Sequence, residues 1–246
     1  MKRPPLVLIH GFRGAPFGLS AIADELRIAG YDVHLAPNPP FAGAPTLSAY
    51  TPETYADHFA NYLKSHHSIK PILIGHSMGT LTVSALASLR PDLVDSRLIL
   101  LSPISYKTAK FFALLAPLSA YLPDFLVNFA TTCYLYTGKG QFNSTMRVTN
   151  ACTKQTTCPK RAVFSAAYFS SHYGVADFQF ADNTNVYIIA GTKDRLISCR
   201  STEKLAHSLH TKPVFLQDTG HLHNYEKPHE TAEEILKILA DSSSAE

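Results

Sequence analysis

The segment best suited to chemistry is the pentapeptide Gly75-His-Ser-Met-Gly79. It directly follows the apolar run 71–74 and leads into the helix-like run 78–89. A buried strand that turns at once into a helix makes a very sharp bend, so the residue at its apex, Ser77, must adopt a strained backbone with its side chain lifted clear. Glycines flank it because a Cβ would collide where strand and helix approach. The same composition is common in loops, so it is the position in the chain that makes Ser77 a candidate nucleophile.

A serine hydroxyl attacks efficiently near neutral pH only when an imidazole takes its proton, and the imidazole needs a carboxylate that fixes its tautomer and stabilises its charge. His221 is the preferred imidazole because it lies in a loop after the last predicted strand, from which a side chain can reach back to Ser77. Asp194 is the preferred carboxylate because it follows a predicted strand through a turn at Gly191. The alternatives that remain open are His223 for the imidazole and Asp177, Asp182 and Asp218 for the carboxylate.

Apolar strand-like runs alternate with amphipathic helix-like runs over most of the chain. Strands are predicted over residues 5–9, 31–35, 69–74, 97–101, 185–190 and 213–216, and helices over 17–29, 51–67, 78–89, 201–209 and 230–239. Strands that alternate with helices pair in parallel, because parallel strands need crossover connections, and the helices then cover both faces of the sheet. The sequence therefore predicts an α/β fold with a mostly parallel sheet flanked by helices.

Length and composition limit the class of protein. The 246 residues are enough for one large domain, and 46% hydrophobic with 17% charged residues is ordinary for a globular chain. A net charge of +3 is too small to indicate nucleic-acid binding, no apolar run has membrane-spanning length, and no export signal is visible, so we expect a cytoplasmic protein. The four cysteines lack metal-ligand spacing and are expected to be reduced, with a Cys152–Cys158 disulfide left open. We expect neither a metal nor another cofactor.

The alternation of strands and helices stops between residues 104 and 175. This stretch holds seven lysines and arginines against one acidic residue, a net charge of +6 in a chain whose total is +3. Its apolar residues, three or four apart, are typical of short helices that bury one face. We predict a core formed by residues 1–104 and 176–246 and a helical cap, residues 105–175, over the carboxyl ends of the strands; the alternative is an extension packed elsewhere. Candidate substrate contacts in the cap are Phe111, Phe112, Leu115, Arg147 and Arg161.

Four motifs together resemble the α/β-hydrolase superfamily over nearly the whole chain. They are His10-Gly11-Phe12, Gly75-His-Ser-Met-Gly79, Gly191-Thr-Lys-Asp194-Arg-Leu-Ile197 and Asp218-Thr-Gly-His221-Leu-His-Asn-Tyr-Glu-Lys-Pro228. The chain is most similar to the compact, capped, esterase-like branch that begins directly at the His-Gly strand. It departs from many relatives at Thr80, where they carry a second glycine, and we expect no effect of this change on the chemistry.

The resemblance implies roles for several residues. The chain order is serine, acid, histidine, which fits Ser77, Asp194 and His221, and two backbone N–H groups, those of Phe12 and Met78, are expected to stabilise an oxyanion. His10 is expected to brace the first loop rather than to do chemistry. Arg13 is predicted to be a surface residue, with substrate contact as the alternative.

The expected activity is hydrolysis of a carboxylic ester or thioester through an acyl-enzyme on Ser77, which water activated by His221 then cleaves. A serine at this position argues against epoxide and haloalkane hydrolysis, which similar proteins carry out with an aspartate. The alternatives are carbon–carbon bond hydrolysis by the same residues and a non-catalytic, ligand-binding role.

The basic cap adds a hypothesis about the partner. Similar esterases that cleave the methyl ester of a pimeloyl chain on acyl carrier protein dock that acidic carrier through basic cap residues. By this resemblance, a carrier-linked ester is a candidate substrate and an acyl carrier protein a candidate partner. The alternative is a basic face that is simply solvated.

Overall fold

The computed structural model describes residues 3–66, 69–106, 117–135, 141–154 and 158–241, and for residues 134, 141–145, 153 and 241 it describes the backbone alone. The predicted substrate contacts Phe111, Phe112 and Leu115 lie outside the described residues, as do the basic residues Lys107, Lys110 and Lys139.

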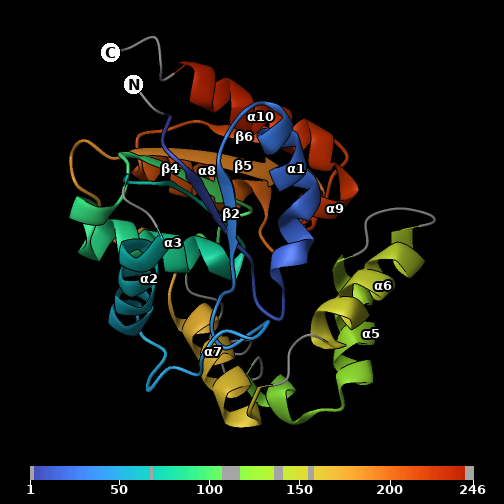
Figure 1. Ribbon diagram of the computed structural model, residues 1–246. Helices are drawn as coiled ribbons and strands as arrows, with labels where there is room; N and C mark the ends of the chain where they lie inside the picture. The colour runs from blue at the N-terminus through green and yellow to red at the C-terminus, as the bar shows by residue number, and fades with distance from the viewer. Residues whose placement is uncertain (1–2, 67–68, 107–116, 136–140, 155–157, 242–246) are drawn as a thin grey trace.

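Six strands of the described chain form one sheet in the order β2-β1-β3-β4-β5-β6 (Figure 1). They are β1 (Leu6–Ile9), β2 (Val33–Ala36), β3 (Ile72–His76), β4 (Arg97–Leu101), β5 (Asn185–Gly191) and β6 (Pro213–Leu216). Every neighbouring pair is parallel, which confirms the predicted pairing. The largest difference in bounds is at β3, which begins at Ile72 rather than at residue 69.

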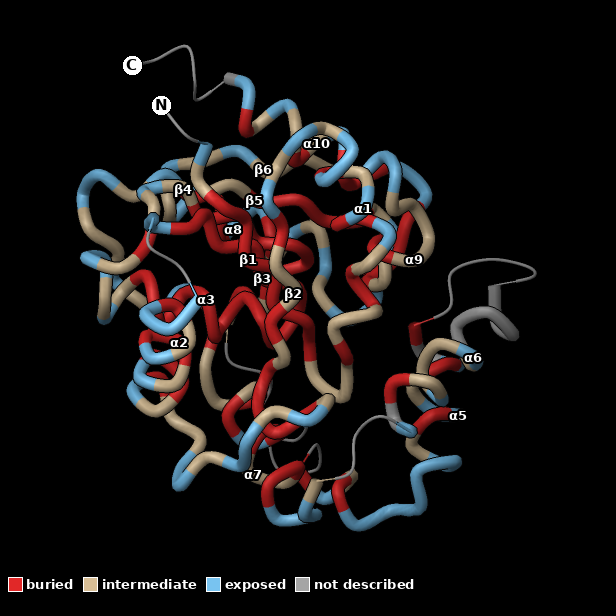
Figure 2. The backbone as a smooth tube through the Cα atoms, viewed as in Figure 1, coloured by how far each residue is buried: buried red, intermediate tan, exposed pale blue. Residues whose placement is uncertain are grey.

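Helices cover both faces of this sheet. α1 (Ser20–Ile28), which follows the short 3-10 helix η1 (Pro16–Leu19), and α10 (Pro228–Asp241) pack on one face. The other face carries α2 (Pro52–His66), α3 (Met78–Leu89) and α8 (Cys199–Ser208), with the 3-10 helix η2 (Pro91–Leu93) between α3 and β4. The central strands β1, β3 and β4 are therefore almost entirely buried, whereas the edge strands β2 and β6 are partly accessible (Figure 2).

Strand β1 shows why these segments appear as continuous apolar runs in the sequence. Its four residues are fully buried; Val7 and Ile9 pack among the helices of one face, and Leu6 and Leu8 among those of the other. A strand with solvent on one face alternates polar and apolar residues, whereas a central parallel strand does not. The absence of alternation was thus the signal of a sheet covered on both sides.

The chain between β4 and β5 is helical where the structure describes it. It contains η3 (Pro117–Tyr121), α5 (Asp124–Leu135), α6 (Gln141–Lys154), α7 (Lys160–His172) and η4 (Val175–Asp177). α5 and α6 pack against each other at the side of the molecule, away from both termini, and α7 packs into the core (Figure 1). The N–H groups of Val175 and Ala176 donate to the carbonyls of Ile104 and Ser105. The chain thus leaves and rejoins the core near the predicted limits of the cap, whose separate role stays a prediction.

Three further observations bear on the sequence predictions. None of the four cysteines, all of which the structure describes, forms a disulfide. Within the described ranges, no helix has both the length and the apolar character needed to cross a membrane. A short helix that was not predicted, α9 (His223–Glu226), begins two residues after His221.

Candidate active site

Ser77 occupies the turn between β3 and α3. Its backbone has φ 54° and ψ −121°, a positive φ that a residue with a Cβ rarely adopts. A Cβ at Gly75 would lie 2.5 Å from the carbonyl oxygen of Gly79, and a Cβ at Gly79 would collide with the carbonyl oxygen of Ile9. Both glycines are therefore required by close packing, and the turn they permit holds Ser77 in its strained conformation, as the sequence predicts.

Ser77, His221 and Asp194 form a continuous chain of hydrogen bonds. His221 Nδ1 lies 2.8 Å from Asp194 Oδ2, and His221 Nε2 lies 2.8 Å from Ser77 Oγ. An ionised carboxylate can only accept, so Nδ1 carries a proton and, in the neutral ring, Nε2 is left to accept the serine proton. The predicted histidine and acid are thus brought to the predicted serine in the geometry that proton transfer from the hydroxyl needs.

Asp194 is held as a carboxylate by several donors. Its second oxygen, Oδ1, accepts hydrogen bonds of 2.8 Å from the N–H groups of both Leu196 and Ile197. Burial acts to raise the pKa of this group, but the interactions with His221 and with the two N–H groups outweigh it, and the pKa is lowered from its ordinary value. The acid therefore stays ionised at neutral pH. Asp218, one of the open alternatives, pairs instead with Lys193 at the surface.

Two backbone N–H groups lie near the serine. Met78 begins α3, so its N–H has no acceptor within the helix. The N–H of Phe12 has no acceptor in the part of the chain that the structure describes, and Phe12 lines the same cavity as Ser77. The helix N-terminus also favours negative charge. These are the two donors that the sequence singles out for an oxyanion.

His10 braces the loop that carries Phe12. Its Nδ1 donates to the carbonyl of Gly11 at 2.9 Å, and its Nε2 accepts the N–H of Asn38 at 3.0 Å. Asn38 also donates from its side chain to the carbonyl of His10 at 2.9 Å. These bonds require the neutral ring, and burial lowers the pKa of His10 to about 4. The expected brace is present, but its partner Asn38 was not anticipated, because it lies in a proline-rich loop without a recognisable motif.

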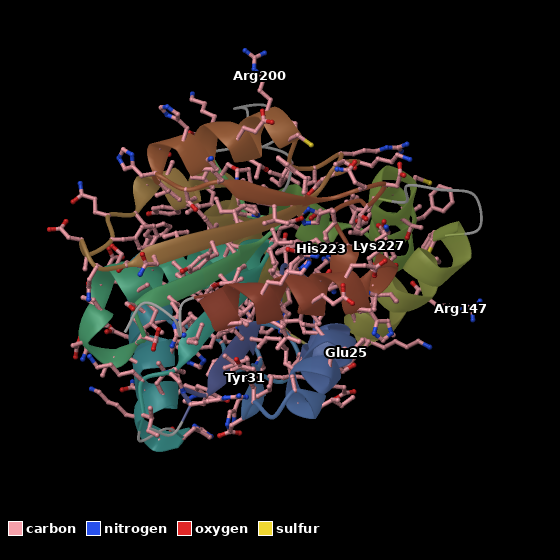
Figure 3. All side chains as sticks on the ribbon, turned by 90° about the horizontal axis from the view of Figure 1, so that it is seen from above. Glu25, Tyr31, Arg147, Arg200, His223 and Lys227 are labelled. Atoms are coloured by element: carbon pink, nitrogen blue, oxygen red, sulfur yellow. The ribbon has the colours of Figure 1, made fainter. Side chains whose placement is uncertain are left out.

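Two more buried histidines flank His221. His76 Nε2 donates to the carbonyl of His221 at 3.0 Å, and burial lowers its pKa well below the ordinary value. His223, the alternative base, contacts Thr231 Oγ1 at 3.2 Å and lies inside the molecule (Figure 3). Burial lowers the pKa of His223 to about 3. Of the three rings, His221 is the one that is hydrogen-bonded to Ser77.

Thr80 and Glu226 also shape the site, and the sequence assigned neither a role. Thr80 Oγ1 donates to the carbonyl of Ser77 at 2.5 Å and accepts the N–H of Ile104 at 3.3 Å, so it ties the serine turn to the end of the core segment. Glu226 accepts the N–H of Gly220 at 2.9 Å and fixes the loop before His221. Glu226 lies in a motif that marks the family, and Thr80 is the position where the sequence departs from many relatives, but neither observation indicated these contacts.

A mainly apolar cavity of about 170 Å³ lies beside Ser77. Its wall includes Phe12, Leu222 and Tyr225 from the core and, from α5 and α6, Leu135, Val148 and Cys152. Among the described residues, no group of three or more His, Cys, Asp or Glu side chains is placed to hold a metal ion. The cavity thus suits a mainly apolar organic group and has Arg13 as a charged residue in its wall.

The described arginines of the cap lie elsewhere. Arg147 and Arg161 are exposed and do not line this cavity, and Figure 3 shows Arg147 projecting from the outer surface. If they contact a substrate, as predicted, they do so outside this cavity, on the surface that a substrate passes on its way to the site.

Arg13 corrects another prediction. Its side chain is only 13% exposed, donates to Asp124 and Ser119 of the helical segment, and lines the cavity beside Ser77. The prediction of a surface residue is wrong because the helical segment covers it.

Comparisons with solved structures show which known proteins share this fold. The structure is similar to an esterase from Thermogutta terrifontis solved with malate bound (20% identity, TM-score 0.80, 98% of this chain and 90% of the other). It is also similar to a bromoperoxidase from Bacillus anthracis (15% identity, TM-score 0.84, 97% of this chain and 92% of the other). A third similar structure is an enol-lactonase from Burkholderia xenovorans LB400 (15% identity, TM-score 0.76, 97% of this chain and 92% of the other). These identities show the fold alone. A search of curated protein sequences gave no match.

A family model described as the alpha/beta hydrolase family matches residues 6–234. That range spans all six strands and includes Ser77, Asp194 and His221. The chain belongs to the alpha/beta hydrolase family.

Proposed function

We infer that this protein is a serine hydrolase that cleaves a carboxylic ester or thioester through an acyl-enzyme on Ser77. The observation that supports this most strongly is the hydrogen-bonded chain from Asp194 through His221 to Ser77, with 2.8 Å at each step. These three hydrogen-bonded side chains lie at the carboxyl edge of the sheet, beside an apolar cavity and next to two backbone N–H groups.

The mechanism follows from the positions of these atoms. Ser77 Oγ attacks the ester carbonyl carbon while His221 Nε2 takes its proton, and the negative charge that forms on the carbonyl oxygen is stabilised by the N–H groups of Phe12 and Met78. The protonated His221 then gives its proton to the departing alkoxide or thiolate, which leaves an acyl group on Ser77. Water attacks this acyl group with His221 as the base, and the free acid and the free serine are restored.

The cavity limits the size of the group it can hold. A dry, apolar cavity of about 150 Å³ accommodates one benzene molecule, so about 170 Å³ has room for roughly six non-hydrogen atoms. We therefore propose short acyl or alkyl groups on this side of the scissile bond.

A narrower proposal is that the ester is linked to an acidic acyl carrier protein. It rests on the basic surface of the helical segment, where Arg147, Lys154, Lys160 and Arg161 are exposed. Such a surface can steer an acidic partner towards the site.

The test is a chain-length series of p-nitrophenyl esters. We expect butyryl and hexanoyl esters to give higher kcat/KM than decanoyl esters, because the longer chain exceeds the cavity.

Ser77→Ala should lower kcat by at least about 10³-fold, and Ser77→Ala with His221→Ala should be little worse, because the two residues act as a unit. Full activity of Ser77→Ala would refute the proposal.

A further inference from the structure

Arg13 follows the candidate oxyanion residue Phe12 directly and is held in an unusual backbone conformation. Its φ is 51°, in the left-handed region that arginine rarely occupies. The turn is closed by a hydrogen bond of 3.1 Å from the Gly14 N–H to the Gly11 carbonyl, on the loop that His10 braces. Such conformations persist only where the surroundings enforce them, and they are concentrated at functional sites. The guanidinium is therefore directed to its place by the same loop that carries Phe12.

The guanidinium has one buried donor without an acceptor. Nη1 donates to Asp124 Oδ1 at 2.9 Å, and Nη2 makes a long contact of 3.4 Å to the Ser119 carbonyl. Nε is inaccessible to solvent and has no hydrogen-bond partner among the described residues. A buried donor left unpaired is unfavourable, more so on a charged group, and an acceptor that arrives with a ligand removes that cost. A guanidinium binds a carboxylate through its N–H donors, and 13% of the Arg13 side chain remains accessible for such a contact.

Arg13 lines three cavities of the described structure, one of which, of about 240 Å³, also contains Asp124. It lines the cavity of about 170 Å³ that contains Ser77 and a neighbouring one of about 280 Å³, and both also include Phe12 and Thr131 in their walls. The wall of the second cavity is otherwise largely apolar, with Leu122, Leu126 and Val127 contributed by the helical segment. A substrate whose ester lies at Ser77 and which extends past Phe12 would meet this guanidinium.

On this basis we propose that Arg13 is a specificity-determining residue that pairs with a carboxylate of the substrate. The preferred substrates are then monoesters of short dicarboxylic acids, in which one carbonyl is attacked by Ser77 and the free carboxylate binds Arg13. This inference rests on the proposed esterase function and narrows its substrate class. Asp124 is 65% exposed, so water competes for its carboxylate and weakens its ion pair with Arg13, whose own side chain is 13% exposed.

The rival explanation is that Arg13 is a structural link between the oxyanion loop and the helical segment. The two roles make different predictions for Asp124→Asn, which removes the ion pair but keeps the guanidinium. Loss of a structural link would affect all substrates alike, whether Arg13 or Asp124 is changed. Loss of a carboxylate-binding residue would affect only charged substrates, and only when Arg13 is changed.

The experiment compares matched esters at pH 7.5, where a free carboxylate is ionised. The pairs are monomethyl succinate with methyl butyrate and monomethyl adipate with methyl hexanoate, and methanol release is measured. For the wild type we expect a higher kcat/KM on the charged member of at least one pair. Arg13→Met, which keeps an apolar stem, should lower the ratio of kcat/KM on the charged ester to kcat/KM on the neutral ester by roughly 10- to 100-fold, mainly through KM.

Asp124→Asn should keep or raise this ratio, because the competing carboxylate is gone. Arg200→Met, at an exposed position on α8 (Figure 3), is the matched control and should keep the wild-type ratio.

Three outcomes would overturn the inference: no preference for the charged ester, an unchanged ratio in Arg13→Met, or equal losses on both esters in Arg13→Met and Asp124→Asn. If neither ester is hydrolysed, the proposed function fails, but the role of Arg13 is still tested by binding. In that case Ser77→Ala should bind monomethyl adipate in calorimetry, and Ser77→Ala combined with Arg13→Met should bind it at least about 10-fold more weakly. Equal binding by the two proteins would refute the role of Arg13.

Discussion

The buried histidines around the site should make the protein unstable in mild acid. Burial lowers the pKa of His10 to about 4 and that of His223 to about 3, and it lowers the pKa of His76 as well. In the unfolded chain each ring takes up a proton near pH 6.5. Below that pH the unfolded state binds more protons than the native state, so stability is fully present above about pH 6.5 and is lost as the pH falls.

The size of the loss can be calculated for His10 and His223. Each pH unit below the unfolded pKa costs about 1.4 kcal/mol per histidine, so at pH 5 each should cost about 2 kcal/mol. Because both native pKa values lie below 5, this figure does not depend on how far below they lie. The two together contribute about 4 kcal/mol, a large part of the 5–15 kcal/mol that stabilises a typical domain.

Substitution of His223 isolates one of these contributions. In the wild type, His223 contacts Thr231. His223→Asn removes the titrating ring but keeps a side-chain donor for Thr231. The free energy of unfolding is measured by urea titration at pH 7 and at pH 5. Its decrease from pH 7 to pH 5 should be smaller by about 2 kcal/mol in His223→Asn than in the wild type. His207→Asn, which changes an exposed histidine of α8, is the matched control. If both variants show the wild-type loss, the account of His223 as a buried neutral ring is refuted.

Three further predictions concern the site and its approach. Asp194→Asn should lower kcat by at least about 10²-fold in steady-state ester hydrolysis, whereas Asp218→Asn should have little effect; the reverse result would show that the acid is wrongly assigned. Gly79→Ala should lower the free energy of unfolding by at least about 2 kcal/mol, since its Cβ meets backbone, and wild-type stability in a urea titration would refute the proposed close packing. Arg147→Glu with Arg161→Glu should lower kcat/KM for a carrier-linked ester in a salt-dependent manner and spare a small neutral ester; equal losses on both would count against docking of a carrier.

The parallel sheet was predictable because its signal is local. Buried strands such as β1 and β4 are short apolar runs, and their order in the chain with intervening helices leaves few ways to pair them. The same holds for the turn at Ser77, since the glycines that permit it are adjacent in sequence. The residues predicted to meet there, Asp194 and His221, follow the ends of β5 and β6 and are carried to one edge by the sheet.

Contacts between distant segments were not predictable from the sequence. Asn38 meets His10 only because β1 and β2 are neighbours in the sheet, and no motif marks that loop. Arg13 is covered by η3 and α5, more than 100 residues away in sequence, so its burial depends on how the helical segment packs. A charged residue beside a loop is ordinarily solvated, and composition alone favoured that interpretation.

The most direct test of the central claim is whether Ser77 forms a covalent adduct. A fluorophosphonate probe reacts with a serine only when a neighbouring base removes its proton and the oxyanion is stabilised. The account predicts one adduct per folded chain by intact mass, located at Ser77 by peptide mapping, absent in Ser77→Ala and formed at least about 10³-fold more slowly in His221→Ala. A folded wild-type protein that does not react, or an adduct at another serine, would contradict it.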